Sequence, residues 1–273
     1  MKLFKTLNLV FSPLILGFLL LMGSLPASLS AENSCRTKIQ QIEQANPNAI
    51  LKARQYVYFL IGAPNAGKGT AGRPFSRALH LPYVSTGDIL RGIIASESEL
   101  GKKIEPIISS GKNIPTEDLK PILSEWISAQ NSQIGFVMDG SPRRLEEALA
   151  LEEIILDAGY KGIRAVYFSI SENSIFTRAA GRLICSNRNC GESFHGEFLA
   201  PRVADHCDFC DSPLKRRADD ASREIVSERI KTFERETLPV IQYFASKGML
   251  QIIDAEASIE EVQEALLTAA LDQ

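Results

Sequence analysis

The chain has 273 residues, of which 45% are hydrophobic and 23% charged, a balance typical of globular proteins that excludes disorder, collagen and coiled coil as the main architecture. Lys and Arg number 30 against 33 Asp and Glu. This near balance excludes the overall positive charge that attracts nucleic acid, so we expect no nucleic-acid partner. The five cysteines are too few for a disulfide scaffold, but four of them lie between positions 185 and 210 and predict a local structural site.

Residues 1–30 have the pattern of a secretory signal peptide. Two lysines near the start precede an uncharged apolar run from Leu7 to Leu25, and Ser28 and Ser30 form a small-x-small cleavage site. The run is also about long enough to span a bilayer, so an uncleaved membrane anchor is the alternative. The segment therefore predicts export to a periplasm, secretion or membrane anchoring, and we expect contact with a membrane only if it stays uncleaved.

Short apolar runs alternate with longer helical stretches along the rest of the chain. Residues 31–54 are polar and are interpreted as a linker. Apolar runs of strand length without polar alternation predict buried parallel strands at 56–61, 135–138, 164–169 and 250–253, with a weaker strand at 83–84. Amphipathic helices are predicted at 116–129 and 222–244, and a last helix after the capping box of Ser258 and Glu261. Strands that alternate with helices predict a doubly wound α/β sheet.

A glycine-rich turn follows the first predicted strand directly. Its sequence is Gly-Ala-Pro-Asn-Ala-Gly-Lys-Gly-Thr, from Gly62 to Thr70. Where such a turn opens a helix, the backbone N–H groups and the helix N-terminus bind an anion, and Lys68 can reach the β- and γ-phosphates of a nucleotide. Asp139, at the end of another buried run, adds a carboxylate for magnesium. Together these residues predict a nucleotide-binding site.

The turn is the first of several motifs that occur in a fixed order. The others are Ser-Thr-Gly-Asp-Ile-Leu-Arg at 85–91, Gly-Lys-Asn-Ile-Pro at 111–115, Asp-Gly-Ser-Pro-Arg at 139–143, Arg-Ala-Ala-Gly-Arg at 178–182, the cysteine cluster and Arg-Ala-Asp-Asp at 217–220. In content, order and spacing the series resembles adenylate kinase of the long, zinc-lid type, in the nucleoside monophosphate kinase family, from about Tyr56 to the C-terminus. The resemblance implies a five-stranded parallel sheet of the P-loop kinase fold with inserted AMP-binding and zinc-binding lid subdomains.

The resemblance also implies the domain boundaries. The core P-loop domain takes residues 55–84, 115–180 and 218–273, the AMP-binding subdomain takes 85–114, and the lid with the four cysteines takes 181–217. Both insertions are expected to move as lids that exclude water from the reaction.

The activity implied by the resemblance is reversible transfer of the γ-phosphoryl group from ATP to AMP, which gives two ADP, with Mg2+ bound to ATP as cofactor. We expect a monomer, and the cytoplasm, which is the default location of the family, is the alternative to export. Because two polyanions must be brought together, the chemistry needs concentrated positive charge. The expected catalytic residues are Lys68, Asp139, Arg143, Arg182, Arg217 and Arg229.

Further binding residues carry over from the family by position. Those expected to bind ATP are Asn65, Ala66, Gly67, Lys68, Gly69, Thr70, Arg178, Arg182, Ser193 and Phe194. Those expected to bind AMP are Thr86, Arg91, Ile114, Gly140, Arg143, Glu147, Arg217 and Arg229. Arg223 is the alternative to Arg229, because the chain has one extra residue after Asp220.

The cysteines follow the spacing Cys185-x4-Cys190-x16-Cys207-x2-Cys210. Two pairs closed by short loops can supply a tetrahedral thiolate site, for which zinc is the usual ion. The resemblance to the zinc lid implies a structural Zn2+ with no open catalytic position, although four residues separate the first pair where two are usual. Two disulfides are the alternative in an oxidising compartment, and His195 and His206 could substitute as ligands.

Four residues depart from the family pattern. Ser141 stands where an aromatic residue is usual, Arg144 where a Thr is usual and Glu147 where a Gln would read the adenine edge. Pro74 lies inside the helix after the glycine-rich turn. These departures leave open an exported, non-catalytic protein that binds nucleotide or zinc and acts through interactions. Retention of Lys68, Asp139 and the arginines favours the active kinase, because charges gathered in one site are costly to assemble.

Overall fold

The structure is a computed structural model that describes residues 27–187 and 189–271. The predicted signal peptide or anchor lies outside the described residues up to residue 26, and residues 27–30 belong to the first helix, α1 (Ala27–Ala45). Within the described ranges, no helix combines the length and the apolar character needed to cross a membrane.

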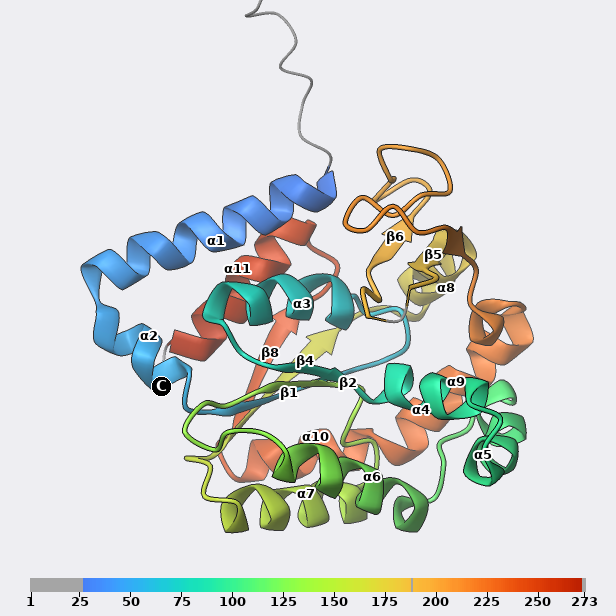
Figure 1. Cartoon of the computed structure of the whole chain (residues 1–273), viewed down its shortest axis with the longest axis horizontal. Helices are drawn as coiled ribbons and strands as arrows, with labels where there is room; N and C mark the ends of the chain where they lie inside the picture. Colours follow the sequence, from blue (N-terminus) through green and yellow to red (C-terminus); the bar gives the residue numbers. More distant parts are fainter. Residues whose placement is uncertain (1–26, 188, 272–273) are drawn as a thin grey trace, which may run out of the picture.

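A five-stranded parallel sheet forms the centre of the fold (Figure 1). In spatial order the strands are β2 (Tyr83–Ser85), β3 (Val137–Asp139), β1 (Val57–Gly62), β4 (Ile163–Ser169) and β8 (Leu250–Asp254). Strands β1 and β4 pair along all of β1, with Val57 opposite Ile163 and Gly62 opposite Phe168. Each predicted apolar run overlaps one of these strands, and the predicted fold class is confirmed.

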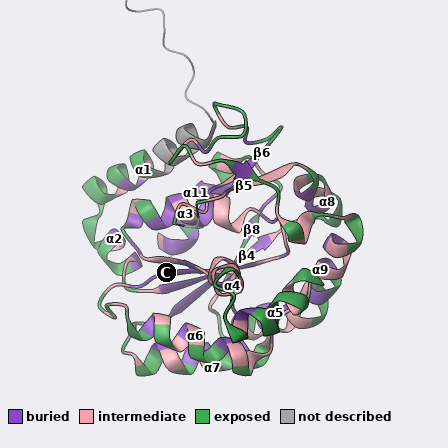
Figure 2. Ribbon diagram, turned by 45° about the vertical axis from the view of Figure 1, so that its right-hand side comes forward, coloured by how far each residue is buried: buried purple, intermediate pink, exposed green. Residues whose placement is uncertain are grey.

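Helices cover both faces of the sheet (Figure 1). One layer consists of α1, α2 (Pro47–Ala53), α3 (Lys68–Leu79) and α11 (Ile259–Leu271), and the other of α6 (Thr116–Ser128), α7 (Leu145–Asp157) and α10 (Leu238–Ser246). The pleat of β1 divides its side chains between two cores, because Tyr58 and Leu60 pack with Phe75 of α3, whereas Phe59 packs with Phe244 of α10. Figure 2 shows that burial is concentrated on the strands.

The segment 31–54 is helical, which corrects its interpretation as a linker. Helix α1 contacts α3 and α11, and α2 contacts α11. Ile39 and Ile50 are 4% and 3% exposed within that core. Asn46 caps α2 with its side chain, and Pro47 occupies the first turn, where its missing N–H does not matter. The polar composition of the segment does not indicate these helices, because a helix on the outside of a core buries only one apolar stripe and is otherwise polar.

The predicted helix at 222–244 is two helices, α9 (Arg223–Glu236) and α10. Pro239 lies in the first turn of α10 and has no N–H to continue the hydrogen bonds of α9. The chain therefore turns at Thr237, between the two helices.

Helix α3, in contrast, continues through Pro74. Pro74 cannot donate to the carbonyl of Thr70, four residues earlier. The side-chain amide nitrogen of Gln263 in α11 lies 3.5 Å from that carbonyl oxygen. A neighbouring helix thus supplies the donor that proline removes.

Two small lobes are inserted between elements of the core. The α4–α5 lobe (residues 85–114) follows β2 and contains α4 (Thr86–Ala95) and α5 (Glu99–Ser109). The cysteine lobe (residues 181–217) follows α8 (Glu172–Gly181) and contains an antiparallel sheet of β6 (Ser193–His195), β5 (Arg182–Cys185) and β7 (Leu214–Lys215). A short 3-10 helix (Ala218–Asp220) leads from it into α9.

Candidate active site

The glycine-rich turn joins the end of β1 to the start of α3. Asn65 and Gly67 have φ angles of 61° and 86°, which bend the chain so that α3 begins at Lys68. No side chain caps this helix N-terminus, so its N–H groups are available to an anion. The Lys68 ammonium donates to the carbonyls of Gly62 and Ala63, both at 2.9 Å. Burial lowers the pKa of Lys68 to about 8, against a weaker opposing effect of Asp139.

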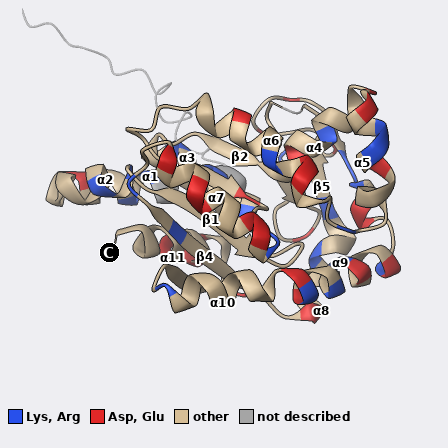
Figure 3. Cartoon of the chain, turned by 90° about the horizontal axis from the view of Figure 1, so that it is seen from below, with Lys and Arg blue, Asp and Glu red and all other residues tan. Residues whose placement is uncertain are grey.

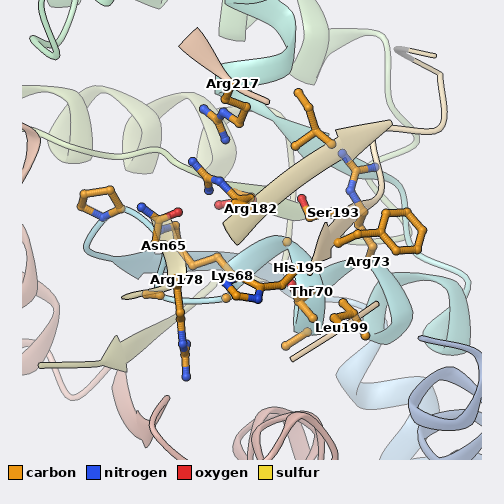
Figure 4. Close-up of a pocket in the computed structure, with 18 of the residues that line it drawn as sticks. Asn65, Lys68, Thr70, Arg73, Arg178, Arg182, Ser193, His195, Leu199 and Arg217 are labelled. Atoms are coloured by element: carbon orange, nitrogen blue, oxygen red, sulfur yellow. The ribbon is translucent and has the colours of Figure 1, made fainter. Parts of the chain in front are cut away.

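A cavity of about 970 Å³ opens in front of this turn, within the size range of ligand sites. It lies between the glycine-rich turn, the α4–α5 lobe, the cysteine lobe and the start of α11. Most of the sequence-predicted nucleotide-binding residues line it, namely Asn65, Ala66, Gly67, Lys68, Gly69, Thr70, Arg91, Asp139, Gly140, Arg143, Arg178, Arg182, Ser193, Phe194, Arg217 and Arg229. Figure 4 shows Lys68, Arg178, Arg182 and Arg217 among the side chains of its wall.

Three of these arginines are held by two acidic residues of the 3-10 helix. The Arg182 Nε lies 2.7 Å from Asp220 Oδ2, and Arg229 Nη1 lies 2.8 Å from Asp220 Oδ1. Arg217 forms a bidentate pair with Asp219, with distances of 2.9 and 2.5 Å. Burial, together with the positive charge of Arg217, lowers the pKa of Arg182 to about 9. The cluster therefore contains more positive charge than its acids neutralise, which is the electrostatic requirement for binding polyphosphate.

The outer surface differs from this wall. On α5 and α9, acidic and basic residues are interspersed, as Figure 3 shows. Positive charge in excess is thus gathered within the cavity.

Asp139 and Arg143 flank the carboxyl end of β3. The Tyr83 hydroxyl donates to Asp139 Oδ2 at 2.8 Å, which orients the carboxylate. Arg143 donates to the Gly140 carbonyl at 2.7 Å and to Asn113 Oδ1 at 2.8 Å. Burial lowers the pKa of Arg143, against the opposing effects of Glu147 and Asp139. An anion placed here would meet a fixed donor.

Arg91 and Arg178 contribute to the wall from α4 and α8. Arg91 pairs with Asp88 one turn earlier on α4. Arg178 donates to the carbonyl of Ala255 at 2.6 Å, which ties α8 to the loop before α11.

Three of the residues expected to bind AMP are not among the described residues that line the cavity. Thr86 is buried and donates to Ser141 Oγ at 2.9 Å. The carbonyl of Ile114 accepts from Arg144 at 3.1 Å. Glu147 is 5% exposed, accepts from the backbone N–H of Arg143 at 2.9 Å, and burial raises its pKa.

The two candidates for the last arginine differ in position. Arg229 lines the cavity, whereas the guanidinium of Arg223 lies 4.0 Å from the ring centroid of Phe176.

The four lobe cysteines converge. Their sulfur atoms all lie within 4.8 Å of one another, with Cys185 and Cys210 at 3.4 Å and Cys190 and Cys207 at 3.6 Å. A tetrahedral zinc site with Zn–S bonds of about 2.3 Å places its sulfurs about 3.8 Å apart, so the donor set and its spacing fit Zn2+. Among the described residues, the group of possible metal ligands consists of these four cysteines. His195 stacks on Phe198, with 4.4 Å between the two ring centroids.

His195 and Arg73 are among the wall residues that the sequence did not predict as nucleotide contacts. His195 follows the predicted pair Ser193 and Phe194 and lines the cavity beside them, so the motif itself could have included it. Arg73 also lines the cavity, one helical turn after Thr70 on the same face of α3. Its only sequence signal is this helical spacing.

Comparison with known proteins agrees with the geometry. The adenylate kinase family model matches residues 60–249. An adenylate kinase of Caldicellulosiruptor bescii is 35% identical over 210 residues, which are 77% of this chain and 96% of the relative. One of Rhizobium rhizogenes is 38% identical over 204 residues, 74% and 93% of the two chains, and one of Rickettsia bellii is 32% identical over 208 residues, 76% and 95%. This chain belongs to the adenylate kinase family.

Proposed function

We propose that the chain catalyses the reversible transfer of the γ-phosphoryl group from ATP to AMP, giving two ADP. The observation that carries this proposal is the gathering of Lys68 and the arginines of α4, the loop after β3, α8, the cysteine lobe and α9 around one cavity. Family membership and the names of the relatives support it.

The proposed mechanism is an exchange of partners around the phosphates. Lys68 leaves the Gly62 and Ala63 carbonyls for the transferring phosphoryl group, and the guanidiniums of Arg182 and Arg229 leave Asp220. Because phosphoryl transfer needs positioning and charge neutralisation more than covalent participation, these donors supply most of the catalysis. Arg91 and Arg143 take the phosphate of AMP. Mg2+ bound with ATP neutralises part of the polyphosphate charge, and Asp139 would hold it through water.

The two inserted lobes are the proposed lids. The α4–α5 lobe would close over AMP and the cysteine lobe over ATP, and both would exclude the water that competes with AMP for the phosphoryl group. We extend the proposal to Ser193, Phe194 and His195 as contacts of the ATP base, because all three line the cavity.

For the AMP base we propose Thr86, Ile114, Gly140 and Glu147. Their support is motif position, together with Gly140 in the cavity wall and Thr86 between the wall residues Ser85 and Gly87. Glu147 is the residue whose role is most open to test, since a carboxylate replaces the amide that matches the adenine edge.

We propose a structural zinc in the cysteine lobe, with two disulfides as the alternative. The support is that all four thiols converge on one point, whereas two separate disulfides need contacts only within each pair. Zinc would stabilise the lobe and take no part in catalysis.

For location we propose export or membrane anchoring through residues 1–30, with the cytoplasm as the alternative, and a monomeric chain. The support is the basic start and apolar run of the sequence. Sequencing the N-terminus of the native protein tests export, because an end near Ala31 is expected and an intact Met1 in a soluble cytoplasmic fraction would contradict it.

The experiment that tests the activity mixes the purified chain with Mg2+ and ADP and measures formation of ATP and AMP. We expect the wild type to convert ADP and Lys68→Ala to lose several hundredfold or more of that activity. Lys52→Ala, at an exposed position on α2, should keep the wild-type activity. Wild-type protein that binds nucleotide without turnover would instead support the non-catalytic interaction protein.

A further inference from the structure

Arg73 stands where the core, the α4–α5 lobe and the cysteine lobe meet. It projects from α3 of the core, and its Nη2 lies 2.7 Å from Asp88 Oδ2 in α4. Its Nη1 donates to the carbonyl of Cys190 in the cysteine lobe at 3.2 Å. One planar guanidinium thus bonds both inserted lobes at once. Figure 4 shows Arg73 among the side chains that line the cavity.

The guanidinium is fixed from two further sides. Its central carbon lies 4.7 Å from the ring centroid of Tyr83, the residue that orients Asp139. Gly191 packs against it with a φ of 61°, and a Cβ at Gly191 would lie 2.5 Å from Arg73 Nη2. A side chain at this position would displace the Arg73 guanidinium, so the glycine lets the cysteine lobe approach Arg73 this closely. Arg73 is held for a defined contact and is only 16% exposed.

Asp88 is shared between Arg73 and Arg91, the arginine assigned to the AMP phosphate. Burial would raise the pKa of Asp88, but the charges of Arg91 and Arg73 hold it below its ordinary value. When Arg91 turns to a phosphate, a buried carboxylate without a second partner would oppose the exchange. Arg73 provides that second partner.

We propose that Arg73 is a positioning residue that couples closure of the cysteine lobe to the release of Arg91 for the AMP phosphate. With the cysteine lobe closed, the Cys190 carbonyl fixes Arg73 against Asp88, so that Asp88 keeps a partner when Arg91 turns to the AMP phosphate. With the lobe open, Arg73 loses this support and Asp88 retains Arg91. Binding of ATP, which closes the lobe, therefore raises the affinity for AMP. This inference rests on the proposed function.

The test measures AMP binding by calorimetry with and without a non-hydrolysable ATP analogue, using the full-length chain. In the wild type the analogue is expected to strengthen AMP binding, and in Arg73→Gln that gain is expected to fall by about tenfold, within the usual range of coupling between sites. Because coupling is reciprocal, the gain that AMP gives to the affinity for the analogue should fall by the same factor in Arg73→Gln. Arg73→Lys keeps a charge for Asp88 but cannot span both lobes, so it should retain AMP affinity and lose the coupling.

Arg77→Gln is the matched control. Arg77 lies one turn further along α3, and its Nη1 is 2.6 Å from Glu192 Oε1 in the cysteine lobe. Its variant removes a lobe contact and should leave the ratio of AMP affinities unchanged. Zinc content and thermal unfolding of each variant report separately on the fold of the lobe.

An equal loss of coupling in Arg77→Gln, or wild-type coupling in both Arg73 variants, would overturn the inference. Wild-type protein that converts ADP yet shows no coupling between the two nucleotides would overturn the inference and leave the proposed function in place. Wild-type protein that binds no AMP would overturn the proposed function and the inference together. Because turnover of ADP is measured in parallel, the two failures are distinguishable.

Discussion

Binding of ATP is expected to draw a proton from solution onto Lys68. In the free chain the ammonium is buried against two neutral carbonyls, and burial lowers its pKa to about 8. The neighbouring cations Arg143, Arg229 and Arg182 act in the same direction. Polyphosphate oxygens at the same ammonium favour the charged form and should return the pKa to its ordinary range near 10.4.

The expected size follows from the two pKa values. At pH 8 the free chain holds Lys68 about half protonated and the complex almost fully, so binding should take up about half a proton per ATP. At pH 7 the uptake should fall to about a tenth of a proton, because Lys68 is then already charged. Uptake therefore rises with pH between 7 and 8, which is the direction that a lowered lysine pKa requires.

Calorimetry of ATP binding in two buffers of different ionisation enthalpy measures this uptake, since the protonation heat of the buffer adds to the observed enthalpy. Lys68→Met, which cannot titrate, should remove the uptake at pH 8. In the wild type, Lys68 should make the free energy of unfolding rise between pH 8 and about 10.4, because the unfolded chain there holds the proton that the folded chain has released. Lys68→Met should lack this rise. Equal uptake in the wild type and Lys68→Met would refute the reasoning.

Three further results are expected. Ile50→Ala should lower the free energy of unfolding by about 2–4 kcal/mol, since Ile50 is 3% exposed, whereas Leu51→Ala at a 57% exposed position should cost far less in the same urea titration. Purified chain should contain about one zinc by metal analysis, and chelation should lower its melting temperature, whereas disulfides at all four cysteines in native protein would contradict this. Glu147→Gln should lower the KM for AMP by up to about tenfold and leave that for ATP unchanged, and an unchanged AMP constant would place Glu147 away from the base.

The centre of the fold could be predicted because buried parallel strands must be apolar on both faces. The runs around Phe59, Met138 and Val166 contain no polar alternation, and each overlaps a strand whose pairing partners lie in the same sheet. Phosphate chemistry is also restrictive, since it requires a turn without bulky side chains followed by Lys68 at the helix start. These two constraints located the glycine-rich turn of the cavity, and the family resemblance supplied the arginines expected around it.

Other features depend on contacts that no local pattern shows. Helix α1 reads as polar because Ile39 and a few neighbours suffice to bury one stripe, and whether such a stripe meets a core depends on the tertiary fold. Pro74 predicts a broken helix until Gln263, far along the chain, is found beside the unbonded carbonyl of Thr70. Arg73 reads as a surface charge on a helix, and only the approach of both lobes gives it partners.

The acidic residues of the cavity have a role that a search for phosphate-binding residues overlooks. Asp88, Asp219 and Asp220 pair with five arginines within the described part of the chain, and these ion pairs order the guanidiniums. Three carboxylates cannot neutralise five guanidiniums, and the remaining positive charge attracts the phosphates. A phosphate that replaces a carboxylate meets a side chain whose rotamer entropy is already lost, which lowers the ordering cost of binding. Because the carboxylates fix the donors before the reaction, charge developing in the transition state meets donors that need little reorganisation.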